Sequence, residues 1–133
     1  MNESNFIKRV HSQLPPSIYK WKINDPYHGG VPDCFYSGPG GHCFVEYKYK
    51  RQFPKRHTSY IKFGLTVQQC AWLNARKDEG VPVFIALGIG KSVVFNNNFD
   101  VANVYTVGDF LKEAMSTSDF IEKIQEICVK YDT

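Results

Sequence analysis

The chain has 133 residues, 43% of them hydrophobic and 22% charged, which are ordinary proportions for a globular protein with one core. No hydrophobic run approaches the roughly 20 residues that span a bilayer, and the polar start MNESNFIKRV lacks the hydrophobic core of a signal peptide. We therefore expect a single domain over residues 1–133, without a membrane partner and in the cytoplasm (the host cytoplasm if a phage encodes it).

The net charge of +3 is distributed unevenly along the chain. Residues 1–99 contain 13 lysines and arginines against 6 acids, whereas residues 100–133 contain 3 against 7. Between Glu46 and Asp78 there is no acid, although eight basic residues occur there, interleaved with aromatic ones. This pattern favours a polyanionic partner, and the alternative interpretation is a solvated loop that happens to be basic.

The first 64 residues predict one helix, three strands and a loop. Apolar residues at helical spacing predict a helix that is capped by Asn2 or Ser4 and ends at Pro15. Alternating patterns and turn residues predict strands over residues 17–23 (half-buried), 31–36 and 42–48. The turn SGPGG joins the last two of these strands, and residues 51–64 follow as a long basic loop.

The second half of the chain predicts a helix, a central strand, a hairpin and two C-terminal helices. Thr66 is a good N-cap for a helix through Asp78. The apolar residues available for burial on this helix are Val67, Cys70, Ala71, Leu73 and Ala75. The remaining elements are a buried strand over 81–88, strands over 92–95 and 101–107, a helix over 109–115, and a helix from Ser118 with an apolar face that includes Ile127 and Tyr131. The order α-β-β-β-α-β indicates an α/β fold with a central mixed β-sheet flanked by helices.

The four cysteines form no CxxC pair. Cys34 and Cys43 face each other across the predicted hairpin, with His28 and His42 nearby, but their spacing matches no closed zinc site. We therefore expect buried, reduced thiols.

Three charged residues near the SGPGG turn suggest a metal site. Side chains alternate between the faces of a strand, so Glu46 and Lys48 point the same way. If the two strands form a hairpin, Asp33 lies next to Glu46, and a hard divalent cation relieves the repulsion between the two carboxylates. The backbone carbonyl of Tyr47 offers a further oxygen ligand. The alternative is an exposed cross-strand ion pair without catalytic function.

The same residues carry a resemblance to a known family. The segments GVPD and VEYK resemble the signature of the PD-(D/E)xK nuclease superfamily. Downstream, Leu65, Thr66, Gln69 and Trp72 resemble the helix motif of its VRR-NUC branch. An N-terminal helical glutamate also occurs in this branch and in the archaeal Holliday-junction resolvases, and Glu3 is the candidate for it here.

The resemblance implies a restriction-endonuclease-like core and metal-dependent cleavage of DNA, with Mg²⁺ or Mn²⁺ as the cofactor. Carried over residue by residue, Asp33 and Glu46 bind the metal, Lys48 is catalytic, and Gln69 assists near the metal or the phosphate. Glu3 is a weaker metal ligand in this scheme. Gln68 stands beside Gln69, so the sequence leaves open which of the two glutamines faces the site.

The expected partner is DNA, bound by exposed basic residues next to the site. These are Lys50, Arg51, Lys55, Arg56 and Lys62. A catalytic domain of this size favours structure-selective cutting of branched DNA, such as a Holliday junction, or weakly sequence-specific cutting. Two cuts on opposite strands favour a homodimer. Two alternatives remain, namely a non-catalytic nucleic-acid-binding module on the same fold, and a protein-interaction domain that uses the acidic C-terminal helix.

Overall fold

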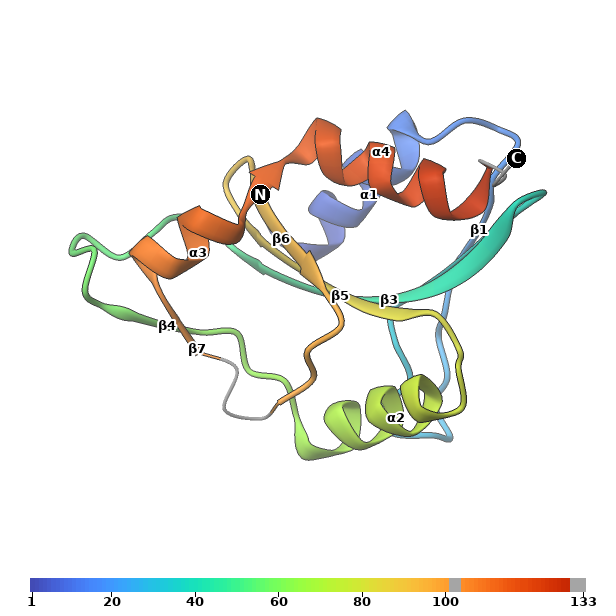
Figure 1. Cartoon of the computed structure of the whole chain (residues 1–133), viewed down its shortest axis with the longest axis horizontal. Coiled ribbons are helices and arrows are strands. Elements are labelled where there is room, and N and C mark those ends of the chain that lie inside the picture. The colour runs from blue at the N-terminus through green and yellow to red at the C-terminus, as the bar shows by residue number, and fades with distance from the viewer. Residues whose placement is uncertain (101–103, 130–133) are drawn as a thin grey trace.

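A six-stranded mixed β-sheet with helices on both faces forms the protein, as the computed structural model in Figure 1 shows. The structure describes residues 1–100 and 104–129. The helices are α1 (Glu3–Gln13), α2 (Val67–Asp78), α3 (Val107–Glu113) and α4 (Thr117–Cys128). The strands are β1 (Tyr19–Lys22), β2 (Cys34–Gly38), β3 (Gly41–Lys50), β4 (Tyr60–Lys62), β5 (Val83–Ile89), β6 (Ser92–Asn96), β7 (Val104–Thr106) and β8 (Met115–Ser116).

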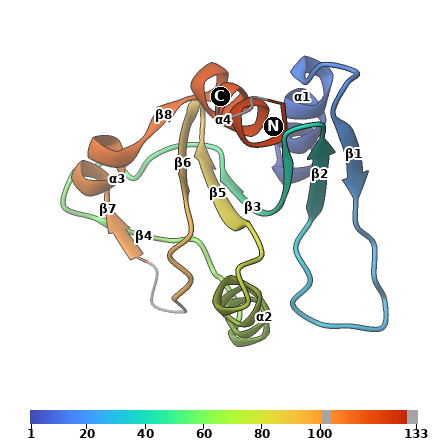
Figure 2. The ribbon, with the colours of Figure 1, turned by 45° about the vertical axis from the view of Figure 1, so that its right-hand side comes forward.

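The sheet has the order β1-β2-β3-β5-β6-β8, in which β3 pairs antiparallel with β2 and parallel with β5. The parallel pair requires a crossover connection, which β4 and α2 supply. α1 and α4 cover one face of the sheet, and α2 lies on the other (Figures 1 and 2). The α/β fold with a central mixed sheet and the element order predicted from the sequence are confirmed.

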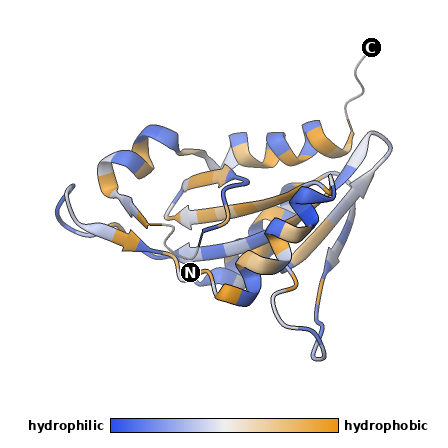
Figure 3. Ribbon diagram, turned by 60° about the horizontal axis from the view of Figure 1, so that its bottom comes forward, coloured by the Kyte–Doolittle hydropathy of each residue, from blue (hydrophilic) through white to orange (hydrophobic). Residues whose placement is uncertain are grey.

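Each face of the sheet has its own hydrophobic core. Under α1 and α4, the rings of Phe6, Tyr47 and Phe120 pack edge to face or tilted against one another. On the opposite face, Leu73 of α2 and Ile85 of β5 belong to a second buried cluster. The amphipathic pattern of α4 is visible in Figure 3 as alternating hydrophobic and hydrophilic bands on the helix that leads to the C-terminus. Across the described residues, no helix has the length and apolar character needed to cross a membrane.

Two predictions for the N-terminal half need correction. The sequence predicts a half-buried strand over residues 17–23. β1 is instead an edge strand that contains no buried residue, so this prediction of burial is wrong. Ile18, just before β1, is buried. The basic segment 51–64 is not only a loop, because β4 within it pairs antiparallel with β7 in a separate two-stranded sheet.

The first helix is capped by Asn2, whose side chain accepts a hydrogen bond from the backbone N–H of Asn5.

Further differences lie in the helices. α2 starts after Thr66 and runs to Asp78 as predicted, but it buries only Cys70 and Leu73. Val67, Ala71 and Ala75 are exposed because α2 contacts the sheet along a narrow stripe. The helix predicted over 109–115 spans Val107–Glu113, since Thr106 caps it. Ile127 is only partly buried, and Tyr131 and residues 101–103 of the predicted strand lie outside the described residues.

The four cysteines are free and buried, as predicted. Cys34 and Cys43 lie on neighbouring strands, in the register Cys34↔Val45 and Tyr36↔Cys43. The two thiols therefore take the place of small apolar side chains in the core under α1 and α4.

The connection between β1 and β2 runs away from the sheet and passes beside α2 (Figure 2). Asp25 organises its turn by accepting hydrogen bonds from the backbone N–H groups of Tyr27 and His28, at 2.8 and 3.1 Å. Gly29 and Gly30 then pass so close to Gln68 that a Cβ atom at either glycine would overlap this residue of α2. This close packing fixes the chain that leads into β2.

We predict that Gly30→Ala destabilises the protein more than Gly64→Ala. Both glycines have positive φ angles, 85° and 78°, so both substitutions carry similar backbone strain. A Cβ at Gly30 meets the backbone of Gln68, whereas a Cβ at Gly64 meets nothing within 4 Å. The extra loss in free energy of unfolding should be about 1 to 3 kcal/mol, measured by urea denaturation. Equal losses for the two variants would contradict the packing of this connection against α2.

Candidate active site

Glu46 of β3 places its carboxyl group inside the protein, on the α2 face of the sheet. The residue is 2% exposed, and it is the one buried charged residue in the described part of the chain. Lys48 points to the same face, and its Nζ lies 3.5 Å from Glu46 Oε2. The lysine is itself mostly buried, with 18% of its side chain exposed. The pair is therefore shielded from water, unlike the exposed ion pair considered as the alternative.

Asp33 lies directly before β2, beside Glu46. Cys34 pairs with Val45, so the antiparallel register brings Asp33 opposite Glu46. One carboxylate oxygen of Asp33, Oδ2, accepts a hydrogen bond of 2.9 Å from the backbone N–H of Tyr47. Because the N–H and C=O of one strand residue point to the same side, the carbonyl of Tyr47 also faces Asp33. The SGPGG turn and the hairpin thus bring both carboxylates together, as the sequence predicted.

Gln69 links α2 to the carboxyl group of Glu46. Its Oε1 accepts from the backbone N–H of Thr66 at 3.0 Å, which completes a capping box at the start of α2. Its Nε2 donates to Glu46 Oε2 at 2.9 Å. The neighbouring Gln68 packs against Gly29 instead. Gln69 is therefore the glutamine that contacts the site, which the sequence left open.

The electrostatics of the site are those of crowded acids. Burial, and next the charge of Asp33, raise the pKa of Glu46 from 4.5 to about 8, although Lys48 opposes the shift. Burial and Asp33 also raise the pKa of Glu3, which projects from the start of α1. Bringing three acids into mutual influence costs stability unless positive charge accompanies them. A bound cation would supply this positive charge.

The oxygen atoms available to a cation are the carboxylates of Asp33 and Glu46 and the carbonyl of Tyr47. These hard donors fit Mg²⁺ or Mn²⁺, which typically take one or two carboxylates together with water and phosphate oxygens. No group of three or more His, Cys, Asp or Glu side chains within residues 1–100 and 104–129 is arranged to hold a metal ion. Glu3 thus does not complete a three-carboxylate cluster, and it acts on the site through its charge.

The five basic residues predicted to contact nucleic acid are exposed and follow the site along the chain. Lys50 and Arg51 lie at the end of β3, two and three positions beyond Lys48. Lys55 and Arg56 belong to a loop that projects from one end of the molecule, and Lys62 lies on β4 (Figure 1). Arg51 also lines a pocket of about 330 Å³ together with Glu3, Tyr49 and three residues of the N-terminus.

A buried hydrogen-bond chain behind the site escaped the sequence analysis. His11 Nε2 and the hydroxyl of Tyr36 are 2.7 Å apart, and the hydroxyls of Tyr36 and Tyr47 are also 2.7 Å apart. These two hydrogen bonds hold the side chain of Tyr47 on the face of β3 opposite Glu46. They therefore fix β3 at the position that carries the site. The alternation in the segment VEYKYK predicted the orientation of Tyr47, but no sequence signal identified its partners.

The fold is similar to that of Hjc, a Holliday junction resolvase from the archaeal hyperthermophile Archaeoglobus fulgidus. The two structures align with a TM-score of 0.55 over 90% of this chain and 95% of that one, at 11% sequence identity. The chain matches no family model and no curated protein. The resemblance to archaeal Holliday-junction resolvases is thereby confirmed for the fold, whereas the VRR-NUC branch stays a prediction.

The raised pKa of Glu46 leads to a prediction for stability. Protonation of Glu46 stabilises the folded state; this stability is complete below pH 4.5 and is lost as the pH rises through about 8. With EDTA present, the free energy of unfolding of the wild type should therefore fall between about pH 5 and about pH 8. Glu46→Gln should flatten this dependence and be more stable than the wild type at about pH 8, by about 1 to 3 kcal/mol.

Glu79→Gln is the matched control, since it changes an exposed glutamate. Its unfolding curve should keep the pH dependence of the wild type, measured by denaturation at each pH. A Glu46→Gln variant that is less stable than the wild type at the upper end of this range would show that the buried carboxylate is stabilising rather than strained.

Proposed function

We propose that the protein is a metal-dependent endodeoxyribonuclease that hydrolyses phosphodiester bonds. The observation that carries this proposal is the buried carboxyl group of Glu46, which contacts Lys48 and Gln69 and lies beside Asp33. Perturbed acids next to a lysine and an amide are typical of a catalytic site. The fold shared with a Holliday junction resolvase supports the same conclusion.

Asp33, Glu46 and the carbonyl of Tyr47 would hold Mg²⁺ or Mn²⁺. When bound, the divalent cation offsets negative charge on the scissile phosphate and lowers the pKa of water. The hydrogen bond from Tyr47 N–H occupies Asp33 Oδ2 and so orients the carboxylate. Gln69 does the same for Glu46 through its 2.9 Å hydrogen bond, so both carboxylates are held in place before a cation arrives.

Lys48 supplies positive charge to the site from the protein itself, in addition to the charge of the proposed cation. Its ammonium group donates hydrogen bonds, so it orients the attacking water or stabilises the charge that develops on the phosphate oxygens. Lys48 follows Glu46 by two residues on β3, so its side chain lies on the same face of the sheet as the carboxylates. The exposed residues Lys50, Arg51, Lys55, Arg56 and Lys62 then bind the phosphate backbone.

We propose branched or junction DNA as the substrate, because the protein with the similar fold is a Holliday junction resolvase. Cuts on two opposing strands require two sites, which a homodimer provides most simply. The cytoplasm is the compartment that we assign to this activity. The second candidate is a nucleic-acid-binding module on the same fold that does not cut, and the presence of Asp33, Glu46 and Lys48 together argues against it.

The decisive experiment measures cleavage of labelled duplex, flap and four-way-junction DNA with Mg²⁺, Mn²⁺ or EDTA. We expect metal-dependent cleavage that Asp33→Asn, Glu46→Gln and Lys48→Met each reduce by about 100-fold or more, with DNA binding largely retained. Lys123→Met, on the exposed surface of α4, controls for the loss of a lysine and should cleave normally. Binding without cleavage of any substrate would identify the non-catalytic module, and normal cleavage by Lys48→Met would refute the proposed mechanism.

The basic loop leads to a separate prediction for DNA binding. Replacing Lys55 and Arg56 by alanine should weaken binding and make the slope of log K against log salt shallower by about 2, because two phosphate contacts are lost. The adjacent pair Lys8 and Arg9, exposed on α1 across the sheet from the site, is the matched control. Equal effects of the two double substitutions, measured by fluorescence anisotropy, would mean that net charge rather than this loop binds DNA.

A further inference from the structure

A row of four aromatic rings crosses the face of the sheet that carries Glu46. Trp21, Phe35 and Phe44 are cross-strand neighbours on β1, β2 and β3, and Trp72 of α2 continues the row. The ring centroids are 6.3, 4.8 and 5.3 Å apart in this order. Since Phe44 lies two positions before Glu46 on β3, the row passes directly beside the candidate active site.

The row is accessible, in contrast to the opposite face of the sheet. α1 and α4 cover that opposite face, whereas on the Glu46 face α2 contacts β5 and reaches β3 through Gln69 and Trp72, and β1 and β2 lie to one side of α2 (Figure 2). Trp21 is 48% exposed, and the other three rings are only partly buried. Large aromatic side chains left partly open on one face indicate a binding surface.

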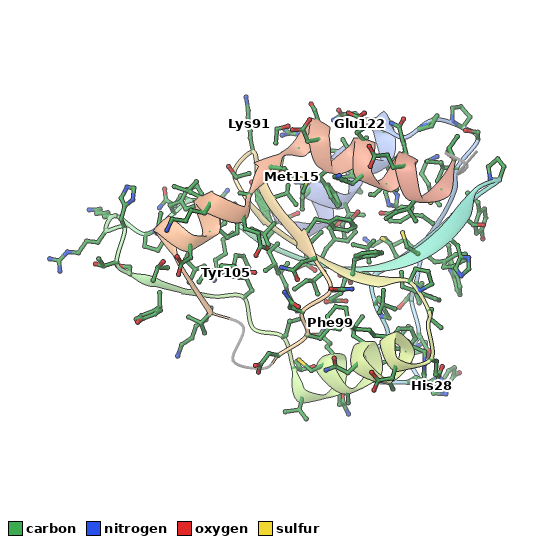
Figure 4. The ribbon with its side chains drawn as sticks, viewed as in Figure 1. His28, Lys91, Phe99, Tyr105, Met115 and Glu122 are labelled. Atoms are coloured by element: carbon green, nitrogen blue, oxygen red, sulfur yellow. The ribbon has the colours of Figure 1, made fainter. Side chains whose placement is uncertain are left out.

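The connection between β1 and β2 makes one wall of a groove over this row. The groove has a volume of about 410 Å³ and is lined mainly by Trp21, Ile23, Pro26, Tyr27, Val31 and Phe44. Tyr27 is 89% exposed, although Asp25 holds its backbone in a hydrogen-bonded turn. The turn lies on the side of α2 where His28 is labelled in Figure 4. An exposed aromatic ring on a hydrogen-bonded turn is available for stacking.

The groove lies next to the position before β2 that carries Asp33. The backbone N–H of Ile23, a residue that lines the groove, donates to the backbone carbonyl of Asp33 at 2.8 Å, so the groove wall is paired with the residue that carries one of the two carboxylates. At the far end of the row, the guanidinium of Arg76, which also donates to both carboxylate oxygens of Glu79, lies 5.4 Å from the ring centre of Trp72. A ligand with flat rings matches the aromatic row, and a nucleic acid combines such rings with the phosphate that the neighbouring site is proposed to cleave.

We propose that the groove binds unpaired nucleobases of the DNA strand next to the scissile phosphate, by stacking on Trp21, Tyr27 and Phe44. The proposal rests on the nuclease function above and narrows its substrate class. Bases within a duplex are already stacked and paired, so only unpaired nucleotides reach these rings. The preferred substrates are therefore flaps, gaps or other branched DNA with single-stranded nucleotides at the branch.

Fluorescence of Trp21 tests the stacking directly. Trp21 and Trp72 are the two tryptophans of the chain, so Trp72→Phe isolates the signal of Trp21 and keeps an aromatic ring in the row. With EDTA present, a single-stranded thymine oligonucleotide should quench this fluorescence to saturation, and a duplex of the same length should not. An unchanged signal at a saturating oligonucleotide concentration would overturn the proposal.

The second test measures oligonucleotide affinity in variants that keep Trp72. Trp21→Leu and Tyr27→Leu should each weaken binding of the labelled oligonucleotide by about 5- to 100-fold, whereas Trp21→Phe and Tyr27→Phe stay close to the wild type. Circular dichroism confirms folding. Should Trp21→Leu fail to fold, the substitution at the highly exposed Tyr27 decides the result. Leucine variants that bind like the wild type would overturn the proposal.

Two further measurements separate the alternatives. If sedimentation shows that Trp21→Leu abolishes a dimer without changing oligonucleotide affinity, the row is a self-association surface and the proposal is wrong. Cleavage is measured in parallel on the wild type with Mg²⁺. If the wild type cleaves DNA but the groove substitutions leave oligonucleotide affinity unchanged, only the stacking proposal is refuted. If the oligonucleotide quenches Trp21 but no substrate is cleaved, the groove is supported and the nuclease function is refuted.

Discussion

The buried carboxyl group of Glu46 is the constraint around which the rest of the site is arranged. An ionised carboxylate in the protein interior is expensive unless hydrogen bonds and positive charge accompany it. Here Gln69 donates to it and Lys48 lies 3.5 Å away, but burial and next the charge of Asp33 still raise the pKa of Glu46 to about 8. This arrangement lowers the stability of the protein at neutral pH, and the cation that we propose would offset the loss. Such a cost is expected where a site must be assembled before its substrate binds.

The fold meets this constraint by using the two faces of β3 differently. On one face, Tyr47 packs under α1 and α4 and is held by the hydroxyl of Tyr36. This rigid side keeps the strand in position. The other face of β3 carries Phe44, Glu46 and Lys48, and α2 covers this face only in part. One strand thereby places Tyr47 in the core under α1 and α4, and places Glu46, buried, between the partly exposed Phe44 and Lys48 on the other face.

The sequence predicted the residues of the site better than its surroundings. Strand alternation, the hairpin turn and the Thr66 cap are local signals, so they located Glu46, Lys48 and the helix that carries Gln69. The choice between two adjacent glutamines depended on how α2 docks, which local patterns do not contain. The aromatic row was missed for the same reason, because Trp21 and Trp72 are brought to one surface only by the strand order and the crossover.

The central claim is that Asp33 and Glu46 hold one divalent cation between them. Anomalous diffraction from crystals grown with Mn²⁺ tests it directly, because the signal locates the metal itself. We predict a single strong peak about 2 Å from a carboxylate oxygen of each residue, with the carbonyl of Tyr47 on the same side. A Mn²⁺ peak elsewhere in the molecule, or none between these two carboxylates at saturating Mn²⁺, would contradict the claim.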